Sequence, residues 1–163
     1  MKKFELTAES KINIFGKKLF RIKALISFGD VEEGETGGWI EKEENLEQSS
    51  GDAWVYGDAE VYGNAEVYGN ARVSGNAWVS GDAWVSGDAD YTTIHGFGTQ
   101  FRTTTFFQCE DKQIRVSCGC FLGTIPEFRE QVKNTREGKI AEEYLMIADL
   151  MEKHFVKEKE SGE

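Results

Sequence analysis

The sequence contains no uninterrupted run of about 18 apolar residues, the length that a membrane-spanning helix requires. Its first residues, MKKFELTAES, also lack the apolar core of a secretory signal peptide. We therefore expect a cytoplasmic protein that does not engage a membrane. Cysteine is scarce: the three residues are Cys109, Cys118 and Cys120, an odd number that argues against a disulfide scaffold. A reducing compartment would keep them as thiols.

Basic residues are too few for the chain to bind nucleic acid non-specifically. Lysine and arginine number 19 against 29 aspartates and glutamates, which gives a net charge of −10. Such binding needs a basic surface that neutralises phosphates. The acidic excess lies between residues 31 and 90, whereas residues 1–30 and 91–136 are basic. This distribution indicates that the flanks fold back onto the middle.

The middle of the chain is a hexapeptide repeat. From Asp52 it reads DAWVYG, DAEVYG, NAEVYG, NARVSG, NAWVSG and DAWVSG, followed by a degenerate DADYTT at residues 88–93. Alanine and valine lie two residues apart in every unit, so they share one face of a short strand. The Gly-Asn or Gly-Asp pair that follows suits a tight corner. The repeat therefore predicts stacked short strands with valine inside.

This pattern resembles the left-handed parallel β-helix of hexapeptide-repeat proteins, in which three hexapeptides make one triangular coil. The resemblance implies that positions eighteen apart lie above one another, so that Val55 stacks on Val73. We expect a mainly β fold: a short left-handed parallel β-helix of about three to four coils over residues 31–93. Its irregular first coil, residues 31–50, would contribute Val31, Ile40 and Leu46. Capping repeats of this kind are needed for a stable stack.

The two flanks predict smaller units. Residues 1–30 predict a β-hairpin cap, because apolar residues alternate around Gly16 in residues 11–28; a basic arm that binds an acidic partner is the alternative. Residues 94–163 predict a small α+β appendage. Its hairpin comes from FRTTTFFQC and QIRVSC around EDK. Its first helix begins at a Thr124–Glu127 capping box and ends before Gly138, and its second carries Ile140, Tyr144, Ile147, Met151 and Phe155 on one face.

Three phrases extend the resemblance over nearly the whole chain: GGWIEKEENL, the GNAxVxG run and IRVSCGCFLGTIPEF. Together they are similar to a group of hexapeptide-repeat proteins found in phages, prophages and gut bacteria. The resemblance implies a homotrimer. It does not by itself imply an activity, because a repeat specifies a fold and function depends on a site.

Histidine is too rare for the enzymes that share this repeat. Hexapeptide acyltransferases use a histidine as general base and cover it with a long loop, but this chain has only His95 and His154, and no loop interrupts residues 51–90. The γ-class carbonic anhydrases need three histidines. A zinc site of the three cysteines and His95 is a further alternative, yet the paired C-x-x-C spacing of structural zinc is absent. We therefore expect no catalysis, no metal and no cofactor.

The residues that flank each valine point outward and include many aromatics. Exposed apolar patches usually mark an interface. The partner could be another subunit or the terminal segments, a ligand whose base stacks on Trp or Tyr while Arg72 or Arg102 meets a phosphate, or another protein. The candidate ligand-binding residues are Trp54, Tyr56, Arg72, Trp78, Trp84, His95, Arg102 and Arg115.

The combined interpretation is a non-catalytic, homotrimeric binding protein encoded by a phage or prophage and acting in the host cytoplasm. It would sequester a small nucleotide-like signal or block a host protein of bacterial antiviral immunity. Two alternatives remain open: an acyltransferase that uses acetyl-CoA with His95 as its base, and a structural or virion accessory protein.

Overall fold

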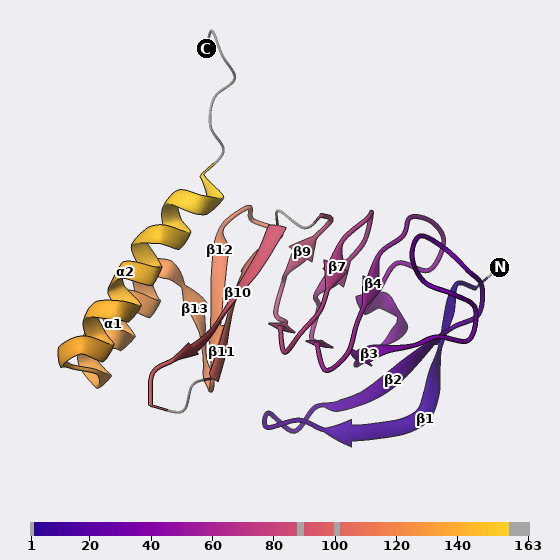
Figure 1. The fold of residues 1–163 in the computed structure, drawn as a ribbon, viewed down its shortest axis with the longest axis horizontal. Coiled ribbons are helices and arrows are strands. Elements are labelled where there is room, and N and C mark those ends of the chain that lie inside the picture. The colour runs from indigo at the N-terminus through magenta and orange to yellow at the C-terminus, as the bar shows by residue number, and fades with distance from the viewer. Residues whose placement is uncertain (1, 88–89, 100–101, 157–163) are drawn as a thin grey trace, which may run out of the picture.

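The computed structural model describes residues 2–87, 90–99 and 102–156, with only the backbone of Arg102. Strands near the N-terminus and the repeats occupy one part of the molecule, and a second sheet with two helices occupies the other (Figure 1). The first three strands are β1 (Phe4–Ile12), β2 (Lys18–Ala24) and β3 (Thr36–Ile40). In the described residues no helix is long and apolar enough to span a bilayer.

Each repeat contributes one strand of two residues, and strands eighteen residues apart pair in parallel. These strands are β4 (Trp54–Val55), β5 (Glu60–Val61), β6 (Glu66–Val67), β7 (Arg72–Val73), β8 (Trp78–Val79) and β9 (Trp84–Val85). Val55 faces Val73, Val61 faces Val79, and Val67 faces Val85. The predicted stacking is confirmed. The repeat alanines and valines are at most 1% exposed, so they form the core of residues 52–87, hereafter the repeat core.

The predicted fold class, a short left-handed parallel β-helix of three to four coils, is wrong. The strands form a five-stranded mixed sheet in the order β1-β2-β3-β5-β8, a four-stranded antiparallel sheet, and the two-stranded pairs β4–β7 and β6–β9. Glycines in the left-handed region, such as Gly57 and Gly63, end the strands after two residues each. The parallel strands are therefore short. The antiparallel strands β1 and β2 extend one set of them, β3-β5-β8, into a mixed sheet.

Residues 2–50 cover the first repeats. The predicted hairpin forms, but it begins at Phe4 and continues the mixed sheet, and its turn lies at residues 13–17. Ile40 pairs with Val61, and Leu46 forms a parallel bridge to Val67, so both extend the valine columns as expected. The fully buried Asn45, in a short helix at Glu43–Asn45, donates to the carbonyl oxygens of Gly63 and Ala65. The Asn45 side chain, which lies outside the repeats, therefore holds the backbone at this corner between two repeats.

The C-terminal part is an antiparallel sheet covered by helices. Its strands are β10 (Tyr91–Phe97), β11 (Arg102–Gln108), β12 (Ile114–Cys118) and β13 (Phe121–Thr124), and its helices are α1 (Ile125–Thr135) and α2 (Gly138–Phe155). The hairpin of β11 and β12, both helices and the Thr124–Glu127 capping box are confirmed. Sequence reasoning missed β10 and β13. Of the degenerate repeat DADYTT, Asp88 and Ala89 lie outside the described residues.

Strand β11 joins the two parts because its side chains alternate between them. Phe106 packs with the helices, on the face of the sheet that lies away from the repeats in Figure 1, and Phe107 belongs to the repeat core. Both rings are fully buried. Ala83 forms a bridge to Cys109, and the amide of Trp78 donates to Oγ1 of Thr105 over 3.1 Å. The sheet therefore closes the end of the repeat core.

Burial distinguishes Trp54 from Trp84, although both hold the same repeat position. Trp54 is fully buried between the rings of Phe4 and Phe28, whereas Trp84 is half-buried. We expect Trp54→Ala to lower the free energy of unfolding by about 3–5 kcal/mol, because it leaves a large cavity. Trp84→Ala should cost clearly less. Urea unfolding of both variants checks this, and equal losses would contradict the buried position of Trp54.

Candidate functional site

A groove of about 570 Å³ lies where three segments of the chain meet. In Figure 1 the turn between β1 and β2 extends along the repeats toward the C-terminal sheet, and the groove lies beside that turn. Its lining combines residues of the hairpin, the repeats and the C-terminal part: Lys11 and Ile14; Asp58, Glu60, Asn76 and Trp78; and His95, Thr103 and Gly119. We refer to this hollow as the groove.

Glu60 is the buried charge of the groove, with 6% of its surface exposed. Its Oε2 lies 3.0 Å from Nζ of Lys11, and its Oε1 accepts a long hydrogen bond of 3.4 Å from Nδ2 of Asn13. The Lys11 ammonium also lies 4.6 Å from the centre of the Trp39 ring, a cation–π distance. A buried carboxylate needs such a partner, since an unpaired one costs much more to bury.

Trp78 supplies the aromatic surface of the groove. It pairs in register with Glu60 on the neighbouring strand, so both side chains project from the same face of the mixed sheet. The indole is half-buried, and Phe15 contacts it edge-on with ring centres 6.1 Å apart. The hydrogen bond from its backbone amide to Thr105 fixes this strand against the C-terminal sheet.

His95 lies on β10 and is exposed. Its Nδ1 is 3.0 Å from Oγ1 of Thr103 on the facing strand. This contact involves a hydroxyl group, whereas the orienting partner of a general-base histidine is commonly a carboxylate. The structure thus brings two predicted residues, Trp78 and His95, to one groove.

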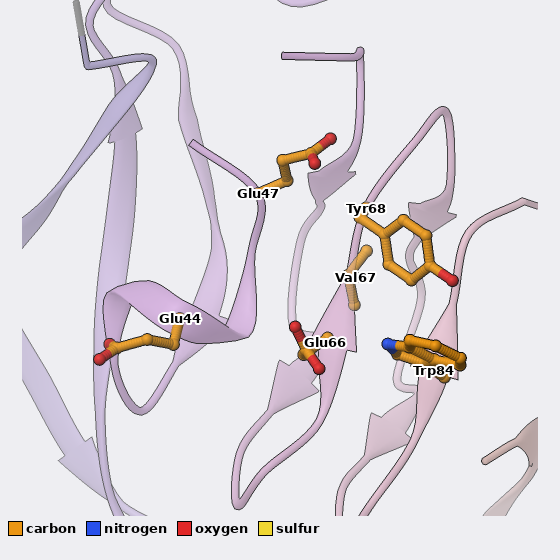
Figure 2. Close-up of a pocket in the computed structure, with 6 residues that line it drawn as sticks. All are labelled: Glu44, Glu47, Glu66, Val67, Tyr68 and Trp84. Atoms are coloured by element: carbon orange, nitrogen blue, oxygen red, sulfur yellow. The ribbon is translucent and has the colours of Figure 1, made fainter. Parts of the chain in front are cut away.

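Trp84 lines a different hollow, of about 290 Å³. Figure 2 shows its indole beside the Tyr68 ring, and their centres are 5.9 Å apart. The charged lining consists of Glu44, Glu47 and Glu66, and in Figure 2 the Glu44 carboxylate points away from the rings. Three carboxylates would repel the phosphates of a nucleotide. This hollow therefore does not suit the ligand that the sequence predicts.

Two other predicted aromatics are covered by the chain itself. Trp54 is fully buried, so it cannot contact a ligand at the surface. Tyr56 is half-buried and packs against the repeat core. Trp54 is covered because Phe4 and Phe28 of the N-terminal segment lie against it, and the repeat pattern carries no signal for that cover. The expectation that the Trp54 ring forms part of a binding surface is therefore corrected.

Of the predicted arginines, Arg72 and Arg115 do not line the groove. Nη2 of Arg72 pairs with Asp30 at 2.6 Å, and Nη2 of Arg115 pairs with Asp111 at 2.8 Å. The hydrogen bond that Arg115 donates to the Asp111 carboxylate raises the pKa of Arg115. The side chain of Arg102 lies outside the described residues. Lys11 is thus the cation that the described lining offers, and its partner is Glu60.

The cysteines do not form a metal centre with His95. Over residues 2–87, 90–99 and 102–156, no three His, Cys, Asp or Glu side chains gather closely enough to hold a metal ion. Cys109 is buried in the repeat core, Cys118 is half-buried, and Cys120 is exposed. Burial raises the pKa of the Cys109 thiol to about 11.

Sequence reasoning missed Lys11, Asn13 and Glu60. A signal existed for Glu60, because the eighteen-residue spacing already placed it beside Trp78. No local signal existed for Lys11, which lines the groove, or for Asn13, which donates to Glu60. The pairing of β2 with β3 brings both residues there.

The cysteines should differ strongly in alkylation. Around pH 9, iodoacetamide should modify Cys120 quickly and leave Cys109 untouched in the folded protein, because thiolate is the reactive form. The raised pKa also means that the fold favours the protonated Cys109 thiol, so this contribution to stability is lost as pH rises toward about 11. Mass spectrometry with and without urea checks the order. Rapid modification of native Cys109 would contradict its burial.

Comparison with known proteins adds no assignment. No model of a protein family matches the chain, and no curated protein sequence matches it. The geometry of the groove is therefore the basis for a functional conclusion.

Proposed function

We propose that the protein is a non-catalytic binding protein that sequesters a small ligand with a planar, nucleobase-like ring in the groove. The observation that carries this proposal is the half-buried Trp78 indole in a hollow of about 570 Å³. Small-molecule sites usually measure about 300–1,000 Å³ and combine an apolar surface with a few polar groups. Stacking of a base on an aromatic side chain contributes about 1–3 kcal/mol.

The charges of the groove favour recognition of the ring over recognition of phosphates. Lys11 and Glu60 neutralise one another at 3.0 Å, and Asp58 adds a negative charge to the lining. Arg72 and Arg115 are paired elsewhere. The phosphate contact expected from Arg72 therefore has no support here, and the polar edge of the ring becomes the group that determines specificity.

A binding role also agrees with the surroundings of His95. A histidine that acts as a general base needs an orienting partner that stabilises its charged form, commonly a carboxylate. In the described groove Nδ1 of His95 meets the Thr103 hydroxyl instead. A different result would favour the acyltransferase. The protein would then bind coenzyme A and transfer its acetyl group, and His95→Ala would abolish that transfer.

The resemblance to phage and prophage proteins supplies the biological setting of the proposal. A protein that removes a nucleotide-like signal of antiviral immunity from the host cytoplasm would need no catalytic group. It would need a groove with sufficient affinity for the signal and a high concentration of the protein in the cell. Association into a homotrimer forms part of this proposal. It is supported by an apolar hollow of about 300 Å³ beside the exposed Phe15 and Leu122 side chains.

Trp78→Ala should weaken the binding of adenosine or guanosine at least about tenfold, because the stacking surface is removed. Trp84→Ala is the matched control, since it changes the same position of the next repeat in another hollow. Titration calorimetry with each nucleoside measures the effect. Equal affinities in the native protein and Trp78→Ala would refute the stacking role, and absence of binding to every nucleoside would refute the proposed function.

Light scattering should give the native protein a mass three times that of one chain. Leu122→Asp should shift it to one chain, because a charge would enter the apolar hollow beside Phe15. Met146→Asp, on the outer face of α2 and 69% exposed, is the control and should leave the mass unchanged. A native protein that remains a single chain at high concentration would contradict the trimer.

A further inference from the structure

We infer that the groove selects a ring edge with two adjacent N–H donors, as guanine has, and that the Glu60 carboxylate accepts both. This inference rests on the proposed function and names the ligand class of the same groove. It requires that Glu60 is held rigidly, that it keeps free acceptor capacity, and that it lies beside the stacking surface.

Glu60 is held rigidly because it is 6% exposed on a strand paired on both sides. A carboxylate has about four acceptor positions on its two oxygens. Lys11 fills one at 3.0 Å, and Asn13 approaches another at 3.4 Å, near the limit of a hydrogen bond. Acceptor capacity therefore remains, and Glu60 lines the groove directly.

The register of the mixed sheet places this carboxylate beside the stacking surface. Glu60 and Trp78 are direct partners on neighbouring parallel strands, which lie about 4.8 Å apart in any sheet. A ring that stacks on the Trp78 indole thus has one edge within reach of Glu60. Asp58 and Asn76, which precede the two strands, add polar groups at the same wall.

The chemistry of this edge separates the bases. Guanine presents its ring N–H and its amino group side by side, so a carboxylate can accept two charge-assisted hydrogen bonds. Adenine presents an unprotonated ring nitrogen beside its amino group, and that lone pair would face the carboxylate. Lys11 already neutralises Glu60, so a neutral ring suits this carboxylate better than a cation with the same donors.

Titration calorimetry of the native chain with guanosine, inosine and adenosine tests the inference. Inosine keeps the ring N–H but lacks the amino group. We expect guanosine to bind at least about tenfold more tightly than adenosine, with inosine between them, since each hydrogen bond to a charged group contributes to discrimination. This series needs no substitution, so it does not depend on whether a variant folds.

Glu60→Gln should remove the preference, because the amide presents a donor in place of one acceptor. Guanosine should then bind about as weakly as adenosine. Glu66→Gln is the matched control: it changes the same repeat position on an exposed side chain that lines the other hollow. Circular dichroism establishes that both variants are folded before the titrations are compared.

The outcomes separate this inference from the proposed function. Equal binding of the three nucleosides, lost in Trp78→Ala, overturns the guanine assignment and leaves the proposed function standing. A guanosine preference that persists in folded Glu60→Gln overturns the role of Glu60. Binding of arginine methyl ester without binding of any nucleoside overturns both proposals, because the groove would then recognise a guanidinium group.

Discussion

Parallel pairing between residues eighteen positions apart is the constraint on which the rest of the structure depends. It brings the alanines and valines of six repeats into one buried core, where each valine contributes about 1.5–3 kcal/mol. The same pairing determines which side chains are neighbours on the outside. Glu60 lies beside Trp78 for no other reason. Core and groove are thus two consequences of one register.

Local signals predicted the elements well and their assembly poorly. The Thr124–Glu127 capping box and the hairpin of β11 and β12 follow from residues close together in the chain, whereas the stacking of Val55 on Val73 follows from the resemblance to hexapeptide-repeat proteins. All three are confirmed. The fold class was wrong because strand length and sheet membership depend on distant partners. Nothing in the repeat indicates that β1 and β2 continue one parallel row into a mixed sheet.

The three repeat tryptophans show why only part of the site was predictable. Trp54, Trp78 and Trp84 occupy one repeat position, so the sequence treats them alike. In the structure Trp54 lies under Phe4 and Phe28, Trp78 lines the groove with Lys11, and Trp84 lines a hollow with three glutamates. Rings of the non-repeating N-terminal segment contact Trp54 and Trp78, whereas Tyr68 of another repeat contacts Trp84. A repeat can predict where a side chain points and cannot predict what lies opposite it.

The mixed sheet also explains how a groove with opposite charges can persist so close to the surface. Lys11 belongs to the hairpin and Glu60 to the repeats, and β2 and β3 connect them through continuous backbone pairing. The lysine is therefore delivered to the buried carboxylate by the sheet, so little side-chain freedom remains to be lost when a ligand arrives. Because preorganised groups lose less entropy on binding, a small groove of this kind can bind a ring-sized ligand without a large interface. The hairpin, which the sequence presented as a cap, thus supplies Lys11 and Ile14 to the lining of the proposed binding groove.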